Sequence, residues 1–310
     1  MSLENFIPTV WAGSILRALD TALVYAQPAI INRDYAGEIT AAGDSVRINQ
    51  VGDITVSSYS KNADIAAPEA LTDAQLVLKI DQAKVFNFAV DDVDQLQQKP
   101  KVMAEASRRA AYSLRKVIDG YIASLYTDIS TTNQIGSDAS PITGTWLTAG
   151  MMAYDRLVDL AVLLDNQDVP EDGRFVVVPP WFEAYLLKDS RFVGFGTVAQ
   201  DNRLTTGALG GTNTGNPAGQ PNDGGGTAMR PVGRAAGFDV YKSNNVPNTA
   251  GIKYKIIAGH NMAWSFVPQI SKVEAFRPER RFSDALKGLV VYGAKTVRPN
   301  CLALLTGNPT

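Results

Sequence analysis

The feature that most constrains the fold is a long amphipathic helix predicted for residues 101–127. Its apolar residues recur every three to four positions, and Pro100 suits the first helical turn. They are Met103, Ala106, Ala110, Leu114, Val117, Ile118, Tyr121, Ile122 and Leu125. At 1.5 Å per residue the helix would run about 40 Å, whereas a compact globule of 310 residues has a radius of gyration of about 20 Å. We therefore expect a flat, extended subunit.

Two runs rich in Val and Ile, residues 45–56 and 76–90, alternate with polar residues and predict strands. The simplest arrangement is one long hairpin with a broad tip, although the apolar phase shifts within the second run. A two-stranded hairpin is marginal in water by itself. We therefore expect it to pack either on the rest of its own chain or on another copy.

The remaining pattern mixes helices and strands and predicts an α+β chain. Helices are predicted at 154–164 and 181–187, on either side of a short apolar strand at 174–178. Twelve of the 26 glycines lie within residues 194–237, which predicts a loop there. Further strands are predicted at 238–242, 252–258, 263–267, 270–276, 289–297 and 302–305.

The composition is that of a folded globular protein, with 45% hydrophobic and 19% charged residues. Lys and Arg total 29 against 31 Asp and Glu, and the formal net charge of −2 argues against a dedicated DNA-binding domain. The sequence contains no apolar window of the roughly 18 residues that a membrane span needs. The first ten residues, MSLENFIPTV, lack the features of a signal peptide. We expect the chain to act in a cytoplasm and not to associate with a membrane.

A single Cys and a single His exclude most enzyme classes. With Cys301 alone no disulfide forms within the chain, and a Cys-rich zinc site is excluded. With His260 alone a site of several His ligands is excluded, and no Ser or Cys nucleophile motif accompanies it. We expect His260 to be a structural residue with satisfied hydrogen bonds.

Two glycine motifs resemble nucleotide-binding patterns by spacing. Residues 194–199 match Gly-x-Gly-x-x-Ala, but no helix pattern follows them, so a flexible turn is favoured. Residues 288–296 nearly form a P-loop, but Ala294 is inserted before Lys295 and the residues between the glycines are typical of a strand. Neither motif predicts nucleotide binding.

An acidic cluster, Asp91, Asp92 and Asp94, could hold a divalent cation through carboxylate oxygens. No second acidic cluster accompanies it, and acidic residues also suit the region before a helix. The second interpretation is favoured, so no catalytic, cofactor-binding or metal-ligating residue is assigned.

The densest basic group is Arg277, Arg280 and Arg281. It is either a solvated turn between strands, or a functional group that forms ion pairs between subunits or contacts nucleic-acid phosphates. The sequence leaves both interpretations open.

An ordered set of segments along nearly the whole chain resembles one family. They are residues 25–28 (YAQP), 32–38 (NRDYAGE), 42–46 (AGDSV), 80–86 (IDQAKVF), 91–92 (DD), 169–180 (VPEDGRFVVVPP), 237–247 (GFDVYKSNNVP), 272–277 (KVEAFR) and 282–295 (FSDALKGLVVYGAK). Together they resemble the major capsid proteins of tailed bacteriophages, of the short-tailed phage coat-protein type.

The resemblance implies the Hong Kong 97-type capsid fold. The implied parts are an N-terminal arm (1–35), an extended loop formed by a long β-hairpin (36–90), a peripheral domain with its spine helix (91–149), an axial domain (150–260) and C-terminal strands that complete the peripheral domain (261–310). The Gly-rich loop 200–236 is longer than the connection expected in that family. Neighbouring copies would then cover the apolar side chains of the hairpin, which are Val46, Ile48, Leu78 and Ile80.

The implied function is structural rather than enzymatic. Copies of the chain would form pentamers and hexamers of the icosahedral head that encloses double-stranded DNA. A separate scaffolding protein, a portal protein at one vertex and weak, non-specific contacts with the DNA are the implied partners, and assembly would take place in the host cytoplasm before the chain resides in the virion. Some relatives crosslink a loop Lys to a neighbour's Asn, and Lys61 and Asn300 are conceivable partners.

Two other functions remain open from the sequence. One is the shell of a cellular nanocompartment that packages a protein cargo, which resembles capsids in fold. The other is a hydrolase built around Asp91, Asp92 and His260.

Overall fold

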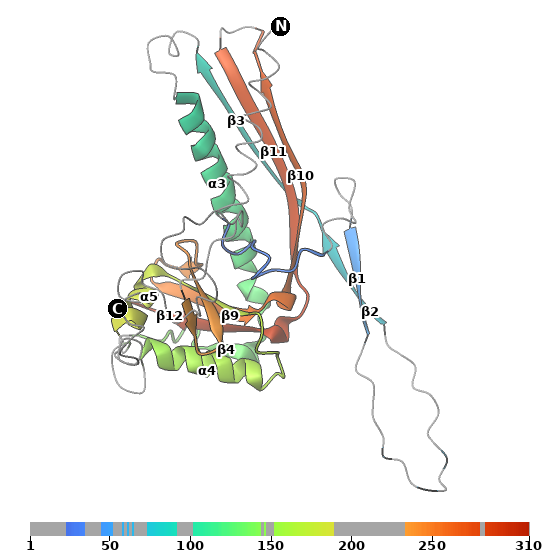
Figure 1. Cartoon of the computed structure of the whole chain (residues 1–310), viewed down its shortest axis with the longest axis vertical. Coiled ribbons are helices and arrows are strands. Elements are labelled where there is room, and N and C mark those ends of the chain that lie inside the picture. Colours follow the sequence, from blue (N-terminus) through green and yellow to red (C-terminus); the bar gives the residue numbers. More distant parts are fainter. Residues whose placement is uncertain are drawn as a thin grey trace, which may run out of the picture.

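The computed structural model describes residues 23–34, 45–51, 58, 61, 64, 73–91, 102–143, 146, 152–188, 233–279 and 283–309. They form an elongated part around a three-stranded sheet and a compact part around a seven-stranded sheet, with a hairpin that leaves the side of the elongated part (Figure 1). The predicted α+β class is confirmed. Most of the Gly-rich loop 200–236 lies outside the described residues.

The elongated part consists of one long helix beside three long antiparallel strands. The strands lie in the order β10 (Trp264–Phe276), β11 (Ser283–Thr296) and β3 (Gln82–Asp91), and α3 (Val102–Ser124) runs along them (Figure 1). The helix confirms the prediction for residues 101–127, and its last predicted turn is the 3-10 helix η3 (Leu125–Asp128). At 1.5 Å per residue, the 23 residues of α3 span about 35 Å.

Helix α3 covers only one face of this sheet. Side chains alternate between the two faces of a strand, and Phe86 and Phe88 of β3 pack with the buried pair Ala111 of α3 and Leu286 of β11. The opposite face carries Val85, whose side chain is 67% exposed. This second face is called the outer face below.

The hairpin is shorter than predicted. Strand β1 (Ser45–Val51) pairs antiparallel with β2 (Asp73–Lys79), but the chain then leaves the hairpin and β3 pairs with β11 instead. The second predicted strand, residues 76–90, is therefore two strands in two sheets. The physical reason is the phase shift in its apolar residues. In one straight strand, the apolar side chains of the two halves would lie on opposite faces and could not both pack on the same core.

The base of the hairpin packs on its own chain. Ile48, Leu78 and Ile80 are buried against Val267 of β10 and Val291 of β11. The expectation that neighbouring copies cover these three side chains is therefore wrong. The break after β2 lets the hairpin fold back over one end of the outer face, so the chain supplies that cover itself. The side chain of Val46 lies outside the described residues.

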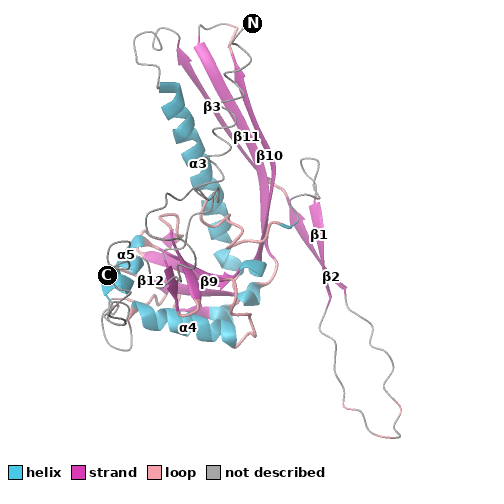
Figure 2. Cartoon of the chain, viewed as in Figure 1, coloured by secondary structure: helices cyan, strands magenta, loops and turns pink. Residues whose placement is uncertain are grey.

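The compact part is a mixed sheet covered on one face by two helices, and its strands are much shorter than those of the elongated part (Figure 2). Helices α4 (Ala153–Asp165) and α5 (Pro180–Lys188) pack over it. The strand order is β4 (Gln134–Ile135), β12 (Leu302–Gly307), β9 (Lys253–His260), β5 (Arg174–Val178), β7 (Phe238–Lys242) and β6 (Gly233–Ala235), with β8 (Asn248–Thr249) paired to β9. Every residue of β5 is buried, as its apolar run predicts.

The C-terminal region 261–310 divides between the two parts. Strands β10 and β11 belong to the long sheet, whereas β12 pairs with β9 in the compact sheet. The short 3-10 helix η6 (Pro299–Cys301) lies between β11 and β12, where the chain passes from one sheet to the other. The strands predicted at 263–267 and 270–276 are a single strand, β10, with an irregularity between Pro268 and Ile270. Proline has no N–H for the ladder, which favours a bulge there.

One hydrophobic core joins the two parts. It contains the second face of the compact sheet, the C-terminal half of α3, the start of β10 and residues 23–31. Phe175 of β5 and Trp264 of β10 lie at its centre with ring centroids 5.8 Å apart. The position of the long sheet on the compact sheet is therefore fixed by packed side chains.

We expect Gly293→Ala to destabilise the chain by about 1 to 3 kcal/mol, the usual cost of overpacking. A Cβ at Gly293 would lie 2.5 Å from the main-chain oxygen of Lys79, where the hairpin crosses β11. Guanidinium denaturation would measure the change.

The matched control is Gly120→Ala in α3, where a Cβ would meet nothing within 4 Å. Because alanine favours helix, the control should stabilise the chain by about 0.5 to 1 kcal/mol. Equal effects of the two changes would contradict the packing explanation.

Candidate functional site

His260, the single histidine, has a structural role in the turn around it. It is buried at the end of β9, and its Nε2 donates to the main-chain oxygen of Asp172 at 2.7 Å. Its Nδ1 accepts the N–H of Met262 at 3.2 Å. Both ring nitrogens are therefore used by the fold, and neither is directed at a substrate.

The glycines of the near P-loop are packing residues. Residues 288–296 lie entirely within β11, so their N–H groups belong to the ladder and cannot surround a phosphate. A Cβ at Gly288 would lie 2.2 Å from the ring of Phe86. Glycine at this position lets the phenylalanine ring lie across the strand.

The other candidate residues are not brought together into a site. Asp91 ends β3 opposite Ser283, and Arg277 follows β10. Lys61 and Asn300 are both exposed, and the main-chain oxygen of Asn300 accepts a hydrogen bond from Asn133 at 2.9 Å. Asp92, Asp94, Arg280, Arg281 and residues 194–199 lie outside the described residues.

Within the described ranges, no group of three or more His, Cys, Asp and Glu side chains could hold a metal ion. None of the helices described is both long and apolar enough to cross a bilayer. The described residues therefore offer surfaces for contact rather than a reactive site. Among the large hydrophobic residues described as exposed, Val85 on the outer face has the highest exposed fraction.

The outer face presents exposed apolar side chains on β3 and β10. The hairpin covers one end of it, near Gly293, and among the described residues the side chains of β3 on this face are exposed. Val85 is 67% exposed and Phe276 is 38% exposed. From the alternation of side chains and the strand register, this face contains Ala83, Val85, Asn87 and Ala89 of β3, Lys287 of β11, and Lys272, Glu274 and Phe276 of β10, whereas Leu289 of β11 is partly buried against the hairpin cluster.

The charged residues of the outer face form one ion-paired group. Glu274 lies between Lys272, at 2.8 Å, and Lys287, at 3.0 Å. The hydrogen bonds from Lys272 and Lys287 lower the pKa of Glu274 to about 2. Lys287 also lies over the ring of Phe276, 5.2 Å from its centroid. The face therefore combines apolar surface with an ion-paired group of two cations and one anion.

A segment near the N-terminus, residues 23–34, crosses from α3 to β10. The N–H of Val24 donates to Oδ2 of Asp119 on α3 at 3.0 Å. At the other end, Asn32 exchanges two main-chain hydrogen bonds with β10, to Trp264 at 3.0 Å and from Phe266 at 2.9 Å. The segment is thus tied to the helix and to the sheet.

Asp119 is the charged residue in this junction that the sequence analysis did not single out. It is only 1% exposed, and this burial raises its pKa to about 6 against the opposing hydrogen bond from Val24. The signal in the sequence was an acidic residue directly after Ile118 and three before Ile122, on the apolar side of the helix.

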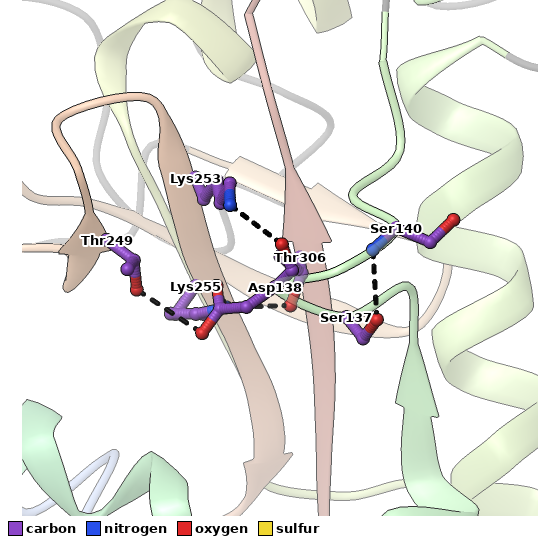
Figure 3. Close-up of polar contacts among 7 residues, drawn as sticks. All are labelled: Ser137, Asp138, Ser140, Thr249, Lys253, Lys255 and Thr306. Atoms are coloured by element: carbon purple, nitrogen blue, oxygen red, sulfur yellow. Dashed lines mark hydrogen bonds and ion pairs between the residues drawn. The ribbon is translucent and has the colours of Figure 1, made fainter.

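A second polar cluster fastens the loop after β4 to the compact sheet (Figure 3). Lys255, whose side chain is 3% exposed, donates to Oδ1 of Asp138 at 2.6 Å and to Oγ1 of Thr306 at 3.2 Å. Lys253 donates to the main-chain oxygen of Asp138 at 2.7 Å. Asp138 is half exposed, and the hydrogen bond from Lys255 lowers its pKa. This arrangement positions a loop and offers no reactive group.

The chain matches a known family over most of its length. The model of a family described as phage capsid protein matches residues 75–305. No curated protein sequence matches the chain.

Solved structures with the same fold include several from viruses. A chain of Mycobacterium phage Che8 is 26% identical, with a TM-score of 0.66 over 92% of this chain and 91% of that one. The capsid of cyanophage P-SCSP1u is 17% identical, with a TM-score of 0.64 over 94% and 89%. A virus-like particle from Pyrococcus furiosus is 10% identical, with a TM-score of 0.54 over 95% and 97%.

We expect Asp119→Asn to stabilise the chain above pH 6 and to have little effect below pH 4. The raised pKa means that the folded state favours the protonated carboxyl. The stability that comes from this preference is complete below the ordinary value of 3.8 and is lost as the pH rises through about 6. A shift of this size corresponds to about 3 kcal/mol. Denaturation at pH 4 and pH 8 would measure it, and a pH-independent effect of the substitution would contradict it.

The Asp138–Lys255 pair should respond asymmetrically to substitution. Asp138→Asn leaves the buried ammonium of Lys255 without its anion and should cost about 1 to 3 kcal/mol. Lys255→Met removes that buried charge and leaves a half-exposed carboxylate that water can solvate, so it should cost less. Thermal unfolding of both variants would decide, and a larger loss for Lys255→Met would refute the argument.

Proposed function

The chain belongs to the phage capsid protein family, and from that membership we propose how its surfaces build a shell. It is a major capsid protein of a tailed bacteriophage with the Hong Kong 97-type fold, and many copies assemble into the capsid of the virion. The proposal concerns the contacts, the partners and the division of the chain into functional parts.

The observation that carries the proposal is the uncovered outer face. This sheet face exposes Val85 on β3 and Phe276 on β10, which makes it suited to an interface. The ion-paired group around Glu274 contains two cations and one anion, so one net positive charge remains there. We infer that neighbouring copies cover this face as they form the pentamers and hexamers of an icosahedral head.

The sequence suggested residues 1–35 as the arm, 36–90 as the extended loop, 91–149 as the peripheral domain, 150–260 as the axial domain and 261–310 as the C-terminal strands. We propose the same parts in the same order, with two changes in the strands that belong to them. The paired hairpin ends at Lys79, so β3 belongs with the peripheral sheet. Strands β4 and β12 pair into the compact sheet and belong with the axial domain.

The remaining partners are part of the proposal as well. A separate scaffolding protein guides assembly in the host cytoplasm. A portal protein occupies one vertex, and double-stranded DNA fills the head through weak, non-specific contacts. The role is structural, without catalysis.

A nanocompartment shell is the less supported alternative. It rests on a shared fold alone, since the virus-like particle from Pyrococcus furiosus is 10% identical to this chain. The family model, in contrast, describes phage capsid proteins.

We expect Val85→Asp to lower the yield of assembled shells by about tenfold or more. Burial of a valine at an interface contributes about 1.5 to 3 kcal/mol, and a buried unpaired carboxylate adds a further penalty. The matched control is Val162→Asp on α4, where the valine is 50% exposed in the compact part. The chain would be expressed with the phage's other head proteins, and shells counted by negative-stain microscopy.

Equal yields from the two variants would contradict the assembly role of the outer face. The contents of shells made from the chain without substitutions test the function itself. Nuclease-protected DNA inside them supports a phage head, whereas a single packaged protein cargo supports a nanocompartment shell.

A further inference from the structure

On its C-terminal side, the hairpin is joined to the long sheet by two residues. Strand β2 ends at Lys79 and β3 begins at Gln82, so Ile80 and Asp81 connect the two sheets. The strands on either side of them have fixed partners, β1 for β2 and β11 for β3. Any movement of the hairpin against the long sheet therefore requires a change at these two residues, which are called the hairpin junction below.

The two side chains of the hairpin junction lie on opposite faces of the long sheet. Ile80 is 6% exposed and packs with Val291 on the outer face. Asp81 points to the other face, where the hydroxyl of Tyr121 on α3 donates a hydrogen bond to its carboxylate. Consecutive side chains of an extended chain point in opposite directions, which allows this arrangement. The hairpin junction therefore contacts the body of the subunit on both faces of the sheet.

Tyr121 is itself held in place by the core that joins the two parts. Its ring packs edge-on against the ring of Tyr292 on β11, with centroids 5.5 Å apart, and Tyr292 is fully buried. Burial raises the pKa of Tyr121, and the carboxylates of Asp81 and Asp128 raise it further. The hydroxyl therefore remains a hydrogen-bond donor throughout the neutral pH range.

Apolar packing alone does not fix the direction of the hairpin. The hairpin lies directly on β11, because a Cβ at Gly293 would be 2.5 Å from the main-chain oxygen of Lys79. Ile48 and Leu78 are buried where it crosses, but apolar burial has no directional preference. A hydrogen bond does depend on direction, and the bond to Asp81 lies within the hairpin junction itself.

We propose that the contact between Asp81 and Tyr121 is a latch that holds the base of the hairpin on the long sheet. With the latch closed, the hairpin leaves the side of the elongated part in one direction (Figure 1). With the latch open, Ile80 is free to leave the outer face and the hairpin turns about its junction. The consequence for assembly rests on the proposed function, because only a hairpin of fixed direction meets neighbouring copies at a defined place.

Limited proteolysis of free subunits tests the latch. Lys79 is exposed at the end of β2, and trypsin cleaves after it when the hairpin junction opens. If opening and closing are fast relative to cleavage, the cleavage rate follows the population of the open form. Lys255 is buried in β9, so cleavage after it reports unfolding of the whole chain. Local opening exposes little surface, so cleavage after Lys79 should depend only weakly on denaturant, unlike cleavage after Lys255.

Two substitutions open the latch from its two sides. Tyr121→Phe removes the hydroxyl and keeps the ring against Tyr292, whereas Asp81→Ala removes the acceptor at an exposed position. Each should speed cleavage after Lys79 by about 3- to 10-fold, which is the effect of losing one hydrogen bond. The double variant should be no faster than the faster single variant, because both changes remove the same contact. Each rate is divided by that of the same chain when unfolded, since Asp81 lies close to the cleaved bond.

The matched control is Tyr126→Phe, which loses the same atom from a tyrosine that also packs partly buried against the joining core. Its ring lies under the ammonium of Lys255, 5.8 Å from the centroid. This control should keep the cleavage rate after Lys79 unchanged. An unchanged rate in Tyr121→Phe, an equal rise in the control, or additive effects of the two latch variants would overturn the proposal.

Shell assembly separates the latch from the proposed function. When the chain is expressed with the phage's other head proteins, the latch variants should form fewer closed shells than the Tyr126→Phe control. Normal shell yields from variants that are cleaved faster would overturn the role of the latch in assembly. Failure of the chain without substitutions to form shells would contradict the capsid role, and the proteolysis of free subunits would still decide whether the latch exists.

Discussion

A sheet has two faces, and the described part of the chain provides one long helix to cover the three long strands. Because α3 covers the face with Phe86 and Phe88, the other face depends on the hairpin at one end and on other molecules for the rest. The proposed assembly surface follows from this imbalance. In a compact protein of the same length, further helices would cover the second face of the sheet. No apolar sheet face would then be left for association.

The sequence predicted the elements whose local pattern agrees with their final surroundings. Helix α3 follows from its apolar periodicity, and β5 and β7 coincide with the predicted strands at 174–178 and 238–242. In these segments one surface, or the whole segment, faces a core, so the spacing of the apolar residues is enough to predict the helix or strand. The fold class followed from the mixture of such helices and strands, whereas the family followed from the resemblance of an ordered set of sequence segments to phage capsid proteins.

The sequence did not predict which sheet a strand joins. The phase shift after Ile80 was visible, but only the pairing of β3 with β11 shows that the strand changes sheet there. The same holds for β12, whose short apolar run fits either sheet. The exposure of Val85 was equally hidden, because a valine in an alternating strand predicts a buried face when the number of covering layers is unknown. The burial of Asp119 could not be predicted either, because it depends on residues far away in the sequence.

The core that joins the two parts has a consequence for synthesis on the ribosome. Val24 bonds Asp119 across 95 residues, and Asn133 bonds the main chain of Leu302 across 169. Trp264 and Leu302, which also belong to that core, are translated long after Val24 and Asp119. Contacts this distant in sequence make folding slow and leave an incomplete chain without its central packing. A nascent subunit therefore cannot present a finished outer face to its neighbours until β10, β11 and β12 have all been synthesised.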